Sequence, residues 1–388
     1  MSIQDTKHRK HTALARPAYG AFHTHEWAVL GAPCDLIQAL TARWVAALQA
    51  DYPLAYVDAD HPGAGDAAAG YAPAGAAAVY TDRIHFHEYR EPRALDAFRQ
   101  RTRFAAAAGV LVNGNHFLGK RQIVLLDPRK RESLARKLDR LTDVRLLLTV
   151  GEEAAVWDYL KTRLPHWQDL PRWSVDEHDR TVAFLRGALH RSRPPVKALV
   201  LAGGHSRRMG TDKGLLDYHG SPQRTHLHRQ LRALGLDTYL SCRADQVDAL
   251  STEFAQLIPD TFTGLGPFGA ILSAFRQDPT AAWLVVACDL PLLDTATLRR
   301  LLADRDATAY ATAFHNPATA FPEPLVALWE PRGYGLLLQY LAQGYSCPRK
   351  VLINSPVREL HLTDASVLLN ANRPADAERV RAQLAAKG

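Results

Sequence analysis

The residues most able to do chemistry gather in one short stretch, "LVLAGGHSRRMGTDKGLL", residues 199–216. An apolar run, 196–201, leads into it and predicts a strand that ends at a pair of glycines. Glycines let a ligand approach backbone N–H groups, and loops at the carboxyl ends of strands in α/β sheets commonly bind ligands. Positive charge is supplied by Arg207, Arg208 and Lys213. The stretch therefore predicts a site for an anion, and a phosphate chain fits it best.

A carboxylate that could complete such a site is Asp289, which follows the apolar run "WLVVAC". Transfer of a nucleotide to an acceptor phosphate requires a triphosphate held in line and a pyrophosphate leaving group whose charge is neutralised. Lys213 can neutralise the triphosphate as a point charge, while Arg207 and Arg208 suit forked contacts with phosphate oxygens. Mg²⁺ prefers one or two carboxylates together with phosphate oxygens, so Asp289 suits a magnesium site. An aspartate after a strand is also a common helix cap, and that interpretation stays open.

These residues need a scaffold, and both halves of the chain show alternating strand and helix patterns. The alternation predicts two α/β domains, each a mostly parallel sheet with helices on both faces. A chain of 388 residues is also too long for one ordinary core. The segment "GALHRSRPP", 187–195, has the composition of a linker, so we expect domains over 1–190 and 195–388. The low-complexity stretch 62–79 predicts a loop.

Composition is typical of a globular protein from a reducing compartment. The chain has 47% hydrophobic and 22% charged residues. No apolar run approaches the roughly 20 residues of a membrane span, and the polar start "MSIQDTKHRKHT" lacks the apolar core of a secretory signal. The four cysteines form no CxxC pair, which favours free thiols in the cytoplasm over a zinc site. The net charge of +7 suits small phosphorylated substrates, and we expect neither nucleic acid nor a membrane as a partner.

Four segments of the second half resemble, in order, the motifs of molybdenum cofactor guanylyltransferases. The first is the opening loop, whose pattern in that family is LAGG-x-S-R-R-M-G-x-D-K-x-L-L, and the match is nearly complete. The others are "PDTFTGLGPFGAI" (259–271), "VVACDLPLL" (285–293) and "LLNANRPAD" (368–376). The resemblance covers residues 195–388. It implies a Rossmann-like nucleotidyltransferase fold for that half.

The same resemblance implies a reaction and a set of site residues. GMP would pass from GTP to the phosphate of Mo-molybdopterin, giving molybdopterin guanine dinucleotide and pyrophosphate, with Mg²⁺ as the cofactor. Lys213, Asp289 and Arg207 would act at the reacting phosphates, with Asp289 as the metal ligand. The implied substrate contacts are Leu201, Ala202, Gly203, Gly204, Arg208, Asp260, Asn370 and Asn372. Proteins that insert the molybdenum cofactor, or apo-molybdoenzymes, would be further partners.

The sequence departs from the family pattern at two places, and rival functions stay open. Cys242 and Arg243 stand where the family has an Asn-Arg pair, which removes one hydrogen-bonding group near the nucleotide, and Arg373 replaces a threonine. One alternative is a CTP-dependent molybdopterin cytidylyltransferase or a nucleotidyltransferase for another small phosphate; relatives that use CTP more often read LAAG with a single arginine. The other is a non-catalytic molybdenum cofactor carrier, against which the joint presence of Lys213 and Asp289 argues.

The first half begins like a P-loop domain, with a strand, a glycine turn, a helix and a second strand that ends in aspartate. It resembles the GTP-binding adaptor protein that accompanies the guanylyltransferase in many bacteria. A phosphate loop needs glycine, lysine and a hydroxyl five to seven residues after Gly31, where this chain has Leu36, Ile37 and Gln38. We therefore expect a degenerate P-loop NTPase-like fold that binds no nucleoside triphosphate and serves as a scaffold or docking module. An unrelated α/β domain is the alternative.

Overall fold

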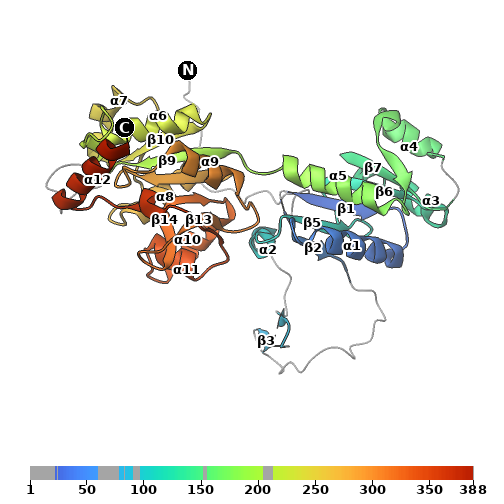
Figure 1. Ribbon diagram of the computed structural model, residues 1–388. Coiled ribbons are helices and arrows are strands. Elements are labelled where there is room, and N and C mark those ends of the chain that lie inside the picture. The colour runs from blue at the N-terminus through green and yellow to red at the C-terminus, as the bar shows by residue number, and fades with distance from the viewer. Residues whose placement is uncertain are drawn as a thin grey trace, which may run out of the picture. The chain divides into compact units, whose positions relative to one another are not determined.

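The chain forms two compact units, residues Met1–Ser192 and Arg193–Gly388. The computed structural model describes residues 22–23, 25–59, 78–82, 84–90, 97–151, 155–203 and 213–387 (Figure 1). The linker predicted at 187–195 is shorter than expected, because α5 (His178–Arg191) runs through its first part. Leu185 and Leu189 of α5 are buried in the core of the first unit, and this packing extends the helix.

The first unit is built on a six-stranded sheet with the order β2-β5-β1-β6-β7-β8, and all its strand pairs are parallel. The strands are β1 (Glu26–Leu30), β2 (Leu54–Val57), β5 (Gly109–Asn113), β6 (Arg121–Leu126), β7 (Val144–Thr149) and β8 (Arg172–Ser174). The helices are α1 (Cys34–Leu48), α2 (Ala97–Phe104), α3 (Arg131–Ala135), α4 (Asp158–Arg163) and α5. A separate antiparallel hairpin joins β3 (Val79–Asp82) to β4 (His87–Arg90).

Both faces of this sheet are covered, because alternate residues of a strand point to opposite sides. Trp27 and Val29 of β1 pack in one buried cluster with residues of α1 and α5. Ala28 and Leu30 pack in another cluster with residues of α3 and α4. Burial on both faces explains why the strand reads as a continuous apolar run.

The connection from β1 to α1 consists of residues 31–33 alone. Residues 36–38, which stand at the phosphate-loop positions, therefore lie inside α1. Ile37 is fully buried in the core between helix and sheet, so it serves packing in place of a phosphate-binding lysine. A connection this short does not surround a β-phosphate with N–H groups as a Gly-rich phosphate loop does. The likeness of the first unit to a P-loop domain stays a prediction.

The first unit, expressed alone as residues 1–192, should show no saturable binding of GTP or ATP by calorimetry at submillimolar concentrations. The reason is the short connection and the buried side chain of Ile37 at the lysine position. The full chain, titrated under the same conditions, is the positive control. Magnesium-dependent binding by the isolated unit would overturn this interpretation.

The second unit has a seven-stranded sheet with the order β11-β10-β9-β12-β14-β13-β15. The strands are β9 (Val196–Leu201), β10 (Asp237–Cys242), β11 (Leu257–Pro259), β12 (Ala282–Ala287), β13 (Ala311–Asn316), β14 (Phe321–Trp329) and β15 (Arg358–Leu360). β14 runs antiparallel to both β12 and β13, and the other neighbours are parallel. The predicted α/β class with mostly parallel sheets is confirmed for both units.

Helices cover both faces of the second sheet (Figure 1). They are α6 (Gln223–Ala233), α7 (Val247–Ser251), α8 (Pro267–Gln277), α9 (Thr295–Ala303), α10 (Arg332–Ala342), α11 (Pro348–Ile353) and α12 (Pro374–Lys387). Ala198 and Val200 of β9 face the core that includes α6 and α9, and Leu199 faces the core that includes α8, α10 and α11. The part of the chain that the structure describes contains no helix long and apolar enough to cross a membrane.

Candidate active site

Four parallel strands of the second unit end at the same edge of the sheet. Leu201 of β9 is in register with Ser241 of β10 and with Ala287 of β12, and β11 continues the same edge beside β10. Residues far apart in the sequence are therefore brought together where these strands end. The residues that follow the four strand ends are Ala202, Arg243, Asp260 and Cys288.

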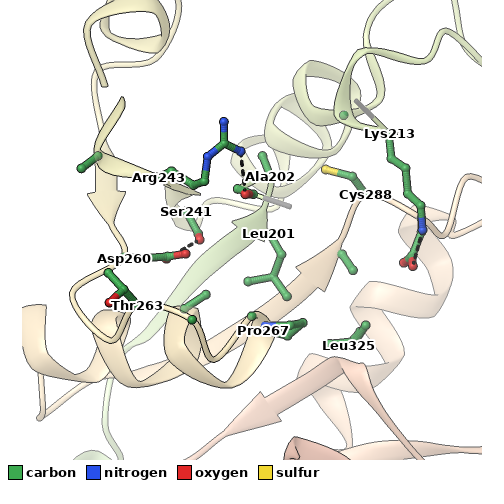
Figure 2. Close-up of a pocket in the computed structure, with 18 of the residues that line it drawn as sticks. Leu201, Ala202, Lys213, Ser241, Arg243, Asp260, Thr263, Pro267, Cys288 and Leu325 are labelled. Atoms are coloured by element: carbon green, nitrogen blue, oxygen red, sulfur yellow. Dashed lines mark hydrogen bonds and ion pairs between the residues drawn. The ribbon is translucent and has the colours of Figure 1, made fainter. Parts of the chain in front are cut away.

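A cavity of about 880 Å³ lies at this edge, within the size range of sites for small molecules. Figure 2 shows Lys213 on one side of it and Ser241, Arg243 and Asp260 on the other. Six of the predicted site residues line this cavity. They are Leu201, Ala202, Gly203, Lys213, Asp260 and Asp289.

Lys213 and Asp289 form an ion pair on one side of the cavity. The Nζ atom of Lys213 lies 3.5 Å from Oδ2 of Asp289, and the two side chains are only 20% and 16% exposed. Lys213 also donates a hydrogen bond to Oδ1 of Asn372. The ammonium group of Lys213 is thus held by two side chains, those of Asp289 and Asn372. The structure thus brings together Lys213, Asp289 and Asn372, which lie far apart in the sequence.

The second carboxylate oxygen of Asp289, Oδ1, is buried and has no hydrogen-bond partner among the described residues. Burial raises the pKa of Asp289, while Lys213 acts in the opposite direction. An unpaired buried oxygen costs free energy unless a cation or donor approaches it. The described residues contain no group of three or more His, Cys, Asp or Glu side chains that could hold a metal alone. The carboxylate therefore suits a divalent cation whose other ligands are phosphate oxygens.

The segment 370–372 lies against Asp289. The backbone N–H of Ala371 donates to the main-chain oxygen of Asp289 at 2.8 Å. Oδ1 of Asn370 is buried and has no hydrogen-bond partner among the described residues, whereas Asn372 accepts the bond from Lys213. Oδ2 of Asp376 accepts from the N–H of Asn372 at 3.2 Å, which fixes the turn. Asn372 thus contacts the ion pair through Lys213, while Asn370 precedes Ala371, the residue whose main chain is bonded to Asp289.

Asp260 occupies the other side of the cavity. Ser241 Oγ donates to Asp260 Oδ1 at 3.0 Å, and the backbone N–H of Asp260 donates to the main-chain oxygen of Cys242. Burial raises the pKa of Asp260, with the bond from Ser241 and the nearby Arg243 opposing it. The guanidinium of Arg243 donates to the main-chain oxygen of Gly203 at 3.0 Å and so ties the end of β10 to the end of β9.

Cys242 lies between two residues that line the cavity. Its side chain is fully buried and packs in the core cluster that includes α6 and α9, whereas Ser241 and Arg243 on either side line the cavity. The structure therefore presents Arg243 at this point, and the loss of a hydrogen-bonding group at Cys242 stays a prediction.

Gly203 packs closely against the end of β10. A Cβ atom there would lie 3.3 Å from the backbone of Cys242 and of Arg243, tighter than ordinary contacts. The predicted site residues Gly204, Arg207 and Arg208 fall within 204–212, outside the described residues. Their positions at the site therefore stay predictions.

Sequence reasoning missed several residues of the cavity wall. Thr263 and Gly266 come from the loop before α8, Pro267 begins α8, and Leu325 comes from β14. The motif 259–271 includes the first three of these, but only its single aspartate, Asp260, is predicted as a site residue. Nothing in the sequence marks Leu325 as a site residue, because it lies within a run whose pattern predicts an ordinary strand.

The loop from Asp260 to Gly266 rests on α8 at Gly269. A Cβ atom at Gly269 would lie 2.1 Å from the main-chain oxygen of Phe262. Thr261 N–H also donates to Ser273 Oγ of α8 at 2.9 Å. The helix thus holds the loop that forms one wall of the cavity.

Gly269→Ala should displace this loop and lower the free energy of unfolding by about 1–3 kcal/mol, measured by urea titration. Gly335→Ala in α10 is the matched control, because nothing lies within 4 Å of a Cβ there. That change should be neutral or stabilising by up to about 1 kcal/mol. Equal effects of the two changes would contradict the packing role of Gly269.

The second half of the chain is similar to known proteins. Residues 198–359 match the family model described as the MobA-like NTP transferase domain. A molybdenum cofactor biosynthesis bifunctional protein of Synechocystis is 31% identical over 185 residues, 48% of this chain and 53% of that protein. The molybdenum cofactor guanylyltransferase of Pseudomonas putida KT2440 is 33% identical over 184 residues, 47% of this chain and 95% of that protein. The chain thus spans about half of the bifunctional relative and nearly all of the guanylyltransferase.

Among solved structures, molybdopterin-guanine dinucleotide biosynthesis protein A from Archaeoglobus fulgidus is 24% identical, with a TM-score of 0.43. It matches 50% of this chain and 100% of its own. From the family model and the relatives, the protein is a nucleotidyltransferase. Through its second half, the chain belongs to the molybdenum cofactor guanylyltransferase family.

Proposed function

We propose that the protein transfers GMP from GTP to the phosphate of Mo-molybdopterin, giving molybdopterin guanine dinucleotide and pyrophosphate. An oxygen of the acceptor phosphate attacks the α-phosphorus of GTP, and the bond from that phosphorus to the bridging oxygen of the β-phosphate breaks. The pair of Lys213 and Asp289 at the cavity is the observation that carries this proposal. The family and its guanylyltransferase relatives supply the choice of substrates.

Charge balance in the cavity supports a metal-dependent reaction. Two cationic side chains, Lys213 and Arg243, and three acidic ones, Asp245, Asp260 and Asp289, line the cavity. A triphosphate beside these carboxylates requires additional positive charge. In this proposal Asp289 holds Mg²⁺, which would neutralise phosphate oxygens when bound. Arg207 and Arg208 would supply the rest.

The residues of the chain then have separate tasks. Lys213 would stabilise the charge that develops on the leaving pyrophosphate, and Asn372 holds its ammonium in place. The N–H groups of residues 201–204 would bind the nucleotide, with Arg207 and Arg208 on the phosphates and Asp260 on the nucleoside. Asn370 would contact substrate near the reacting phosphate. The first unit would serve as a scaffold or docking module.

GTP should be the preferred donor, and turnover should require a divalent metal. Pyrophosphate release would be measured for the purified chain with molybdopterin and each of the four nucleoside triphosphates, with Mg²⁺ and with a chelator. We expect GTP to exceed CTP by roughly tenfold or more, because a site that hydrogen-bonds one base leaves groups unpaired with another. Equal or faster turnover with CTP would instead favour the cytidylyltransferase, and binding without turnover of any triphosphate would favour the carrier.

Asp289→Asn and Lys213→Ala should each slow transfer by roughly 100-fold or more, because each removes a charge at the reacting phosphates. Lys213→Ala should also weaken triphosphate binding. The fold should survive Asp289→Asn, because Oδ1 has no hydrogen-bond partner among the described residues that the change would remove. Circular dichroism and the unfolding midpoint test this second point.

The pair of Lys197 and Asp278 provides matched controls for these variants. It is also an ion pair of the second unit, with a separation of 2.9 Å and exposures of 21% and 23%. Lys197 lies near the start of β9, at the opposite end from the cavity. Lys197→Ala and Asp278→Asn should therefore change the transfer rate by less than about twofold, in line with a surface position away from the site. Near-normal rates for Asp289→Asn would show that the metal carboxylate is elsewhere.

A further inference from the structure

The first unit contains a cysteine–histidine pair that nucleotidyl transfer does not use. Cys34 is the first residue of α1, and its Sγ lies 3.4 Å from Nε2 of His116. Nδ2 of Asn115 lies 3.6 Å from the same sulfur. A nucleophile within hydrogen-bond reach of a base is the arrangement that activates a thiol.

Hydrogen bonds fix the turn that carries the histidine. The backbone N–H of His116 donates to the main-chain oxygen of Asn113 at 3.1 Å, and that of Asn115 donates to Oδ1 of Asn113. Nδ2 of Asn115 also donates to the main-chain oxygen of Ala32 at 2.9 Å. This bond ties the turn after β5 to the connection before α1. The connection after β1 and the turn after β5 therefore together position Cys34 and His116.

The pair lies at the carboxyl edge of the parallel sheet, where α/β folds commonly bind ligands. Cys34 follows the central strand β1, and His116 follows its neighbour β5. The chain then crosses to β6 on the other side of β1, so the strand order reverses direction at this point. Such a switch point is where ligands enter an open α/β sheet. Both side chains are partly exposed and so accessible from solvent.

Positive charge is present near the sulfur. No side chain caps the start of α1, and the first N–H groups of a helix lack intrahelical partners. Lys137 and Arg140 both donate to main-chain oxygens of the turn at 114–115. Burial and Arg140 lower the pKa of Lys137, and Cys34 acts in the opposite direction, so the ammonium is within electrostatic reach of the sulfur. Helix N-termini and nearby cations stabilise negative charge on sulfur.

We infer that Cys34 is a reactive thiol that exchanges with small disulfides, with His116 as its base. The thiol proton passes to Nε2 of His116, and the sulfur attacks one sulfur of the disulfide. A new S–S bond forms, the old one breaks, and the leaving thiolate takes the proton from His116. The disulfide is the oxidant. Cys34 is the only cysteine in residues 1–192, so the product in this unit is a mixed disulfide with the small thiol.

Oxidised glutathione, added to the full chain, tests this inference. The rate of mixed-disulfide formation at each cysteine would be followed by peptide mass spectrometry. Cys347 is exposed and is the internal reference, whereas Cys34 is only partly exposed. We expect Cys34 to react at least about tenfold faster than Cys347, because activation outweighs exposure. A rate at Cys34 equal to or below that at Cys347 would overturn the inference without any variant.

His116→Gln tests the role of the base. It should slow the reaction of Cys34 by at least about tenfold and leave the rate at Cys347 unchanged. Circular dichroism and the unfolding midpoint of residues 1–192 check that the first unit is still folded. His166→Gln is the matched control, because that side chain is 87% exposed in the same unit, and it should leave Cys34 unchanged. A normal rate at Cys34 in His116→Gln would show that the histidine only packs against the sulfur.

Discussion

The ion pair between Lys213 and Asp289 is the contact around which the candidate active site is organised. Bringing a carboxylate out of water raises its pKa, and the nearby ammonium opposes that rise. Asn372 holds the same ammonium, and the neighbouring Ala371 is hydrogen-bonded to the main chain of Asp289. The pair leaves one carboxylate oxygen unpartnered among the described residues. A nucleotide and a metal could complete that arrangement, which a closed structural salt bridge would not allow.

The parallel strands place this pair opposite the Asp260 side of the cavity. Because β9, β10, β11 and β12 run in one direction, every loop at their carboxyl ends faces the same space. The antiparallel β14 then adds Leu325 to the wall. Arg243 links two of the strand ends through Gly203. The cavity is thus a consequence of strand direction, while its chemistry depends on the few side chains that follow each strand.

The two units carry different polar side chains at the carboxyl edge of their parallel strands. In the second unit that edge carries carboxylates and a lysine suited to phosphates. In the first unit the connection after the central strand is too short for a phosphate loop, and Cys34 begins the helix directly. A thiol, an imidazole and an amide meet there. The edge of the first parallel sheet thus carries a cysteine–histidine pair where the second sheet carries an ion pair.

The sequence alone determined the strand and helix alternation, because both signals are local: runs such as "VKALVL" are buried on two faces, and Pro267 and Thr295 each begin a helix. It also determined the motif residues Lys213, Asp260 and Asp289, whose types fix their chemistry. Only the tertiary structure decided which side chains meet. The contact of Lys213 with Asn372 spans 159 positions, and no local pattern encodes it. The burial of Cys242 depends on which face of β10 is covered, and the pair of Cys34 with His116 could not be predicted because it joins two separate connections of the sheet.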